Sequence, residues 1–197
     1  MKFKPKNYSH LVGLKGFSKE LLTNHFKLYE GYVENTNKLM EILLMEDKES
    51  PKFAETKRRF GWEFDGMRLH EYYFDNLGDY AALKKSPLQE AVEKDFGSFA
   101  QWENDFRTTA AIRGSGWAIL YRDHWTGSLF NIWVTEHDVG HLAGCSPLLV
   151  LDAFEHAYML DYGIERKNYI AAFIENIRWA IAAERFDNAR EYVPTEV

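Results

Sequence analysis

Apolar and polar residues repeat with a helical period near the start of the chain. Ser18 is a favourable N-cap, and apolar side chains then recur every three or four positions as far as about residue 47. Leu21, Leu22 and Leu28 share one face with His25 in this pattern. The spacing therefore predicts one long helix with an apolar face.

Two shorter helices are expected next. Ser50-Pro51 opens a helix that should reach about Phe60, and Asp65-Gly66 is a turn signal. A third helix is expected over residues 67–77, with Gly78 as its C-cap. We therefore predict that residues 1–82 form a helical hairpin domain.

In the rest of the chain the hydrophobic period changes from helix to strand and back. Gly97 separates two helices, and Thr126-Gly127 marks a hairpin loop between two strand-like segments. The expected elements are helices over 87–96 and from 99 to about 112, strands over 116–121, 129–135 and 147–151, a short helix ending near 158, and a last helix over about 166–183. This order predicts an α+β fold, in which a small antiparallel three-stranded sheet flanked by helices occupies residues 83–197.

Composition and charge exclude several classes of protein. The chain has 197 residues and a net charge of -6, so a nucleic-acid-binding surface is not expected. The single cysteine, Cys145, allows no internal disulfide and no thiolate metal cluster. We find no signal peptide and no transmembrane segment, so we expect a cytoplasmic protein that does not bind membranes.

Candidate chemistry begins at Asp152, which ends a short apolar run. His156 follows four residues later, so two hard metal ligands can lie close together. An N-cap aspartate followed by a packing histidine is the alternative interpretation. Two further histidines, His25 and His70, lie on the apolar faces of two predicted helices. Three imidazoles and one carboxylate would suit iron, manganese or zinc, and the lack of thiolates makes a structural zinc site less favoured.

Several motifs resemble those of the iron/manganese superoxide dismutase family. Residues 152–158, Asp-Ala-Phe-Glu-His-Ala-Tyr, resemble its D-x-W-E-H-A-Y signature, and residues 114–117 match its G-S-G-W. The segments 94–99, 69–74 and 21–25 resemble further family motifs in the right order. The resemblance extends from about residue 17 to residue 186.

The resemblance implies a superoxide dismutase that converts superoxide to dioxygen and hydrogen peroxide. Its metal ligands would be His25, His70, Asp152 and His156, with solvent as the fifth ligand and one iron or manganese ion per chain between the two domains. Both metals accept these ligands, so the sequence leaves the choice open. The alternative is a homologue that keeps the fold and the metal but has no turnover; a carboxylate-bridged di-iron bundle would need Glu-x-x-His pairs that are absent from the sequence.

Around the metal, the resemblance assigns further roles. His137 aligns with a glutamine that hydrogen-bonds the bound solvent, and Gly66 occupies the other position from which the family supplies that glutamine. The alternative for His137 is a surface-loop histidine. Trp117 is expected to wall the pocket, while Phe154 and Ile119 replace two tryptophans of the family.

The proton path and the dimer contact are the last implications of the resemblance. Tyr29 and Val33 replace a histidine and a tyrosine of the family, so either Tyr29 or Tyr32 could be the gateway residue; Met159 replaces a second tyrosine. Glu155 would bond the ligand histidine of an opposite subunit, which implies a homodimer and leaves open a tetramer built on it.

Overall fold

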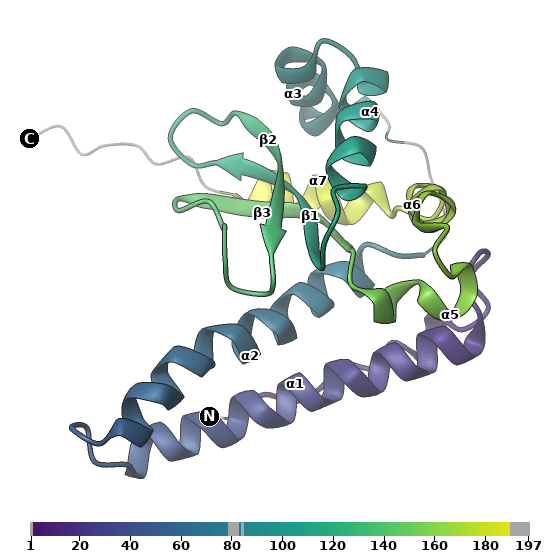
Figure 1. Ribbon diagram of the computed structural model, residues 1–197. Helices are drawn as coiled ribbons and strands as arrows, with labels where there is room; N and C mark the ends of the chain where they lie inside the picture. The colour runs from purple at the N-terminus through teal and green to yellow at the C-terminus, as the bar shows by residue number, and fades with distance from the viewer. Residues whose placement is uncertain (1, 79–82, 84, 190–197) are drawn as a thin grey trace, which may run out of the picture.

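The computed structural model describes residues 2–78, 83 and 85–189 and has the α+β fold expected from the sequence (Figure 1). Two long helices, α1 (Lys19–Met45) and α2 (Pro51–Asp75), run antiparallel along one side of the molecule. Ser18 and Ser50 cap them, because each hydroxyl oxygen accepts a hydrogen bond from the backbone N–H three residues later. α1 begins where the hydrophobic pattern predicts.

The predicted turn at Asp65-Gly66 is wrong, because residues 51–75 form one helix. Gly66 lies inside α2, and a Cβ atom there would be 2.7 Å from Cδ1 of Tyr32. Glycine costs about 1 kcal/mol relative to alanine in a helix, but here it lets the ring of Tyr32 lie against the α2 backbone. The C-cap is Asn76 rather than Gly78.

The sheet has the strand order β2-β1-β3, and both pairings are antiparallel. β1 (Gly116–Asp123), β2 (Leu129–Thr135) and β3 (Cys145–Asp152) match the predicted strands to within two residues at each end. Helices α4 and α7 cover the sheet at the end distant from α1 (Figure 1). The remaining helices are η1 (Ser9–Leu11), α3 (Pro87–Phe96), α4 (Phe99–Ala110), η2 (Glu155–Ala157), α5 (Met159–Tyr162), α6 (Arg166–Ile174) and α7 (Trp179–Asn188).

The predicted last helix is in fact two helices, α6 and α7. The backbone between them pairs with the segment after α2: Arg178 N–H donates to the Asn76 carbonyl at 2.7 Å, and Gly78 N–H donates to the Asn176 carbonyl at 3.1 Å. These groups are therefore not available to continue a helix. The helix predicted to reach about residue 112 ends at Ala110, so Ile112 lies beyond it and is exposed.

Two further expectations concern the chain as a whole. The boundary expected between residues 82 and 83 falls among positions 79–82 and 84, which lie outside the described residues. Among the described helices, none combines the length and the apolar character needed to cross a bilayer. The end of β3 packs on α2 and reaches α1 through Asp152 and His25, and this junction positions the candidate site (Figure 1).

Candidate metal centre

Three imidazoles converge on one carboxylate oxygen, and the four side chains come from four elements. Oδ2 of Asp152, the last residue of β3, lies 3.1 Å from Nε2 of His25 on α1 and 3.6 Å from Nε2 of His70 on α2. Nε2 of His156, in η2, lies 3.0 Å from the same oxygen. One ligand atom from each residue lies within 4.8 Å of all the others, so the four could hold one metal ion.

Hydrogen bonds on the far sides of His70 and Asp152 orient the atoms that face this point. Nδ1–H of His70 donates to the Gly66 carbonyl at 2.5 Å, which leaves the lone pair on Nε2. Oδ1 of Asp152 accepts the Phe154 N–H at 2.8 Å, which leaves Oδ2 as the inward oxygen. Metal-binding histidines and carboxylates are commonly oriented by such bonds.

One buried nitrogen in the cluster has no partner. His25, His70 and Asp152 are at most 1% exposed, and Nε2 of His70 makes no hydrogen bond to any part of the chain that the structure describes. A buried polar atom without a partner is unfavourable in a folded protein, so it indicates a missing ligand. The donor set therefore fits a metal ion.

The electrostatics favour neutral His25 and His70 rings beside an ionised Asp152. Burial lowers the pKa of His25 below its ordinary value and lowers that of His70 further, with His25 adding to the effect. Burial opposes ionisation of Asp152, but the charge of His156 and the hydrogen bonds from His156 and His25 outweigh it and hold the pKa of Asp152 well below its usual range. Three nitrogen donors and one anionic oxygen suit iron, manganese or zinc.

A second layer of hydrogen bonds surrounds His137, which is completely buried. Its Nδ1 accepts the indole N–H of Trp117 at 3.1 Å, and its Nε2 lies 2.8 Å from the hydroxyl of Tyr32. Burial lowers the pKa of His137 to about 4, so the ring is neutral at pH 7. Because the indole can only donate, the proton of the neutral ring is on Nε2 and is donated to the Tyr32 oxygen. The hydroxyl proton of Tyr32 is then free for another acceptor.

Aromatic rings wall this region. The ring of Phe154 stacks on that of His137 at a centroid distance of 4.8 Å and on that of His156 at 5.4 Å. Trp117 meets the ring of His70 edge-on at 5.1 Å. These contacts leave the donor atoms in surroundings that are mostly apolar, which strengthens electrostatic interactions inside.

The structure separates the two candidate gateway tyrosines. The Tyr29 hydroxyl donates to Glu71 at 3.0 Å and accepts the Lys6 N–H at 3.0 Å, so it is bonded away from the four ligands. Tyr32 reaches His137 from seven residues after His25, and α1 is α-helical throughout, without a bulge.

Trp62 also belongs to the site, although the sequence-based reasoning did not include it. Its ring lies 4.4 Å from that of His137 and 5.4 Å from that of Tyr32. It precedes His70 by eight residues, so it occupies the same face of α2 two turns earlier. The mistaken turn at Asp65-Gly66 concealed this relationship.

Glu155, predicted at a subunit contact, and Met159, which replaces a tyrosine of the family, both lie near the surface. Oε2 of Glu155 accepts a hydrogen bond from the Ser115 hydroxyl at 3.0 Å, and the side chain of Met159 is exposed. Met159 is followed by two more exposed apolar residues, Leu160 and Ile164.

Comparisons with known proteins agree with this geometry. Residues 84–185 match the family model of the iron/manganese superoxide dismutases, C-terminal domain. The chain is 38% identical to a superoxide dismutase (Fe) of Cupriavidus metallidurans over 88% of this chain and 90% of that protein. It is 34% identical to a superoxide dismutase (Fe) of Aquifex aeolicus, over 95% of this chain and 92% of the relative, and 34% identical to superoxide dismutase (Mn) 2 of Haloferax volcanii, over 88% and 89%. The chain belongs to the iron/manganese superoxide dismutase family.

Proposed function

We propose that this member of the iron/manganese superoxide dismutase family converts superoxide to dioxygen and hydrogen peroxide at one iron or manganese ion per chain, held by His25, His70, Asp152 and His156. The observation that carries the proposal is the unpaired, buried Nε2 of His70 beside the ionised Asp152. A bound ion of either metal supplies two accessible oxidation states, so one superoxide is oxidised and the next is reduced.

The surrounding residues supply a proton and a dry pocket. Tyr32 holds its hydroxyl proton, because burial and the charge of Asp152 raise its pKa. Since His137 donates to the Tyr32 oxygen, that proton can be directed at another acceptor. Trp117 and Phe154 exclude water beside the ligand histidines. Since both ring nitrogens of His137 already have protein partners, we propose that His137 acts on the site through Tyr32.

The activity is tested by direct measurement of superoxide consumption. Protein loaded with iron or with manganese should consume superoxide, whereas protein loaded with zinc, which has no second oxidation state, should not. If the chain binds iron and manganese but neither form has turnover, the fold-retaining binding or structural homologue is the correct interpretation.

The role of His137 is tested separately by redox titration. His137→Gln and His137→Ala, each loaded with iron and with manganese, should move the reduction potential by roughly 65–130 mV. The reason is that His137 directs the Tyr32 hydroxyl proton, and a hydrogen bond from that hydroxyl to a charged group would contribute about 1.5–3 kcal/mol. Unchanged potentials and an unchanged metal preference in both variants would show that His137 does not tune the metal.

We also propose a homodimer in which Glu155 reaches His156 of the partner subunit. The exposed apolar side chains of Met159, Leu160 and Ile164, 48%, 53% and 87% exposed, follow Glu155 in the chain and support an interface here. Breaking a partly buried charged contact costs about 3–5 kcal/mol, and symmetry repeats the loss. Sedimentation of Glu155→Ala should show weaker dimers with less bound metal; an unchanged dimer with full metal content would contradict the contact, and a larger species in the wild type would indicate a tetramer.

Two further proposals concern organisation and location. Residues 1–82 and 83–197 are proposed as two domains with the metal between them, which limited proteolysis near residue 82 would test. The chain is proposed to be cytoplasmic, and fractionation of cells that produce it would show whether it is found in another compartment instead.

A further inference from the structure

The loop that carries His137 is a tight turn after β2. Thr135 and Val139 exchange two backbone hydrogen bonds, of 2.9 and 3.3 Å, across its base. Glu136, with φ of 57°, is the only non-glycine residue of the described chain in the left-handed region. The direction of the His137 side chain therefore depends on a turn whose own backbone conformation is unfavourable.

A second histidine, His141, holds this turn from outside. Its Nε2 lies 2.7 Å from the backbone carbonyl oxygen of His137, and its Nδ1 lies 2.6 Å from the hydroxyl of Tyr121. A carbonyl oxygen only accepts hydrogen bonds, so Nε2 of His141 carries a proton and donates it. In the neutral ring, Nδ1 then accepts the O–H of Tyr121.

Asp65 is the competing partner of His141, and it is too far away. Its Oδ2 lies 3.9 Å from Nε2 of His141, beyond the range of a hydrogen bond, whereas the carbonyl lies at 2.7 Å. Tyr121 is 2% exposed, so its hydroxyl occupies a defined position in the core. His141 is therefore bonded at both ring nitrogens to groups that the fold holds in place.

Both ends of this arrangement come from one strand. Trp117 and Tyr121 are four residues apart on β1, so their side chains lie on the same face of the sheet. Trp117 bonds the ring of His137, and Tyr121 bonds its main chain through His141. The strand thus determines both the position of the turn and the direction of the ring.

We propose that His141 is a positioning residue for the superoxide reaction. It fixes the His137 carbonyl so that the imidazole lies between the Trp117 indole and the Tyr32 hydroxyl. The consequence for the metal rests on the role proposed above for His137, but the positioning itself can be measured in protein without metal.

The test uses three variants of the full-length chain. His141→Ala removes both contacts; His141→Gln keeps a donor near the Nε2 position, and His141→Asn keeps one only near the Nδ1 position. His124→Ala is the matched control, because His124 is a half-buried histidine whose Nε2 lies 2.7 Å from the Ser146 hydroxyl at the far end of β1. Thermal unfolding by circular dichroism verifies that each variant folds.

The first readout is the indole N–H resonance of Trp117 in metal-free protein, which reports its bond to His137. In His141→Ala it should shift, and its hydrogen exchange should become about tenfold faster. His141→Gln should restore most of the wild-type behaviour, whereas His141→Asn should not. His124→Ala should leave the Trp117 resonance and its exchange rate as in the wild type. An unmoved Trp117 resonance in a folded His141→Ala variant, or equal rescue by Asn and Gln, would overturn the proposal.

The second readout is the reduction potential of the metal-loaded variants. His141→Ala should change the equilibrium constant for one-electron reduction about threefold, which corresponds to about 28 mV, and the His124 control should leave it unchanged. If the Trp117 resonance moves but the potential does not, the tuning role of His137 is wrong and His141 has no part in the reaction. If the Trp117 resonance does not move, the positioning role of His141 is wrong, but the proposed role of His137 is not affected.

Discussion

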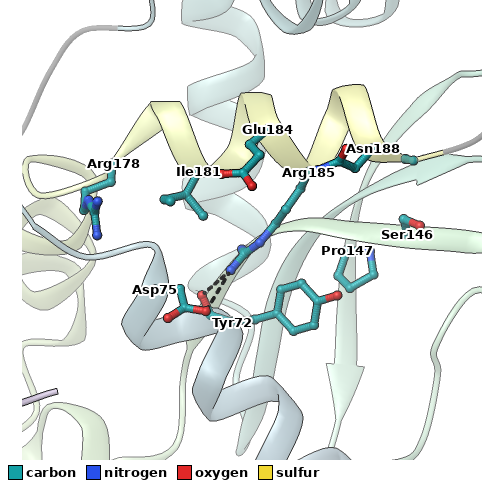
Figure 2. Close-up of a pocket in the computed structure, with 10 residues that line it drawn as sticks. Tyr72, Asp75, Ser146, Pro147, Arg178, Ile181, Glu184, Arg185 and Asn188 are labelled. Carbon is teal, nitrogen blue, oxygen red and sulfur yellow. Dashed lines mark hydrogen bonds and ion pairs between the residues drawn. The ribbon is translucent and has the colours of Figure 1, made fainter. Parts of the chain in front are cut away.

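Two clusters of polar side chains lie along α2, and they differ in how completely their atoms are paired. In the metal centre, Nε2 of His70 is buried without a partner. One turn further along, Arg185 extends from α7 towards Asp75 and Tyr72 across a cavity of about 510 Å³ (Figure 2). We call this second group the Arg185 brace; it comprises Arg185, Asp75, Asn76 and the carbonyls of Tyr72 and Leu148.

The brace satisfies its guanidinium within the described fold. One terminal nitrogen of Arg185 donates to Asn76 Oδ1 at 2.6 Å and to the Leu148 carbonyl at 3.0 Å. The other donates to the Tyr72 carbonyl at 3.4 Å and lies 3.7 Å from Asp75. α7, β3 and the end of α2 are thereby tied together.

In this fold, the size of a cavity does not identify the functional site. The brace borders a large cavity, yet its charged group is paired with the protein. In the metal centre, His25, His70 and Asp152 are buried, yet Nε2 of His70 and Oδ2 of Asp152 face each other at 3.6 Å without a hydrogen bond between them. Unpaired buried atoms distinguish binding from bracing more reliably than empty volume does.

The strongest test of the contrast removes a ligand. His70→Ala should lower metal affinity by at least about a hundredfold, because changes in groups that only support metal ligands already cost about 10–100-fold. Superoxide consumption should fall to background. Elemental analysis and activity measurements check both, and wild-type metal content with full activity would remove His70 from the site.

The reciprocal change is Arg185→Ala, which should destabilise the fold without emptying the metal centre. Breaking a buried charged contact costs about 3–5 kcal/mol, or a fall in melting temperature of about 6–20 °C for a chain of this size. Metal bound per folded chain should not change. Arg178→Ala, which lines the same cavity, is the control; metal loss that exceeds the loss of folded protein would contradict the distinction.

The pH dependence of stability provides a third test. His137 has a pKa of about 4 when folded, against about 6.5 in an unfolded chain, so between these values the unfolded state binds more protons. Stability should therefore fall as the pH is lowered from about 7 to 4, and the contribution of His137 to this fall is at most about 3 kcal/mol. Urea unfolding of His137→Gln should show a shallower decline than the wild type; parallel curves would mean that His137 does not titrate in this way.

The smallest expected effect is at the exposed edge of the brace. Lys6 Nζ lies 2.9 Å from Asp75 Oδ2, but the two side chains are 50% and 31% exposed. Lys6→Ala should cost only about 0.2–1 kcal/mol, and the difference should shrink at high salt. A salt-independent loss as large as that in Arg185→Ala would place Lys6 among the structural contacts of the brace.

Local signals predicted the start of α1, the strands and the end of α3 because each depends on neighbouring residues, such as the Ser18 cap or Gly97 with its φ of 86°. Two of the wrong helix boundaries were decided by distant contacts. Tyr32 packs against Gly66 and keeps α2 continuous. The segment around Asn76 pairs with the backbone before α7 and interrupts the last helix.

The candidate site shows the same division. The four proposed ligands were identified from residue type and motif, and the structure brings them together. The contacts of Trp62 and His141 were not predictable, because they depend on an unbroken α2 and on a turn with Glu136 in the left-handed region. Glutamate carries no local preference for that conformation.

The distances along the sequence between the ligands have a consequence for the order of folding. Contacts between α1 and α2, such as that of Tyr29 with Glu71, span 42 residues, whereas His25 and Asp152 are 127 residues apart. Closing the longer loop costs about 1 kcal/mol more entropy. The α1–α2 hairpin can thus form early, and the contact of the Asp152 carboxylate with His25 forms last. Metal capture is then a late event in folding, so added metal should slow unfolding while leaving the rate of folding nearly unchanged.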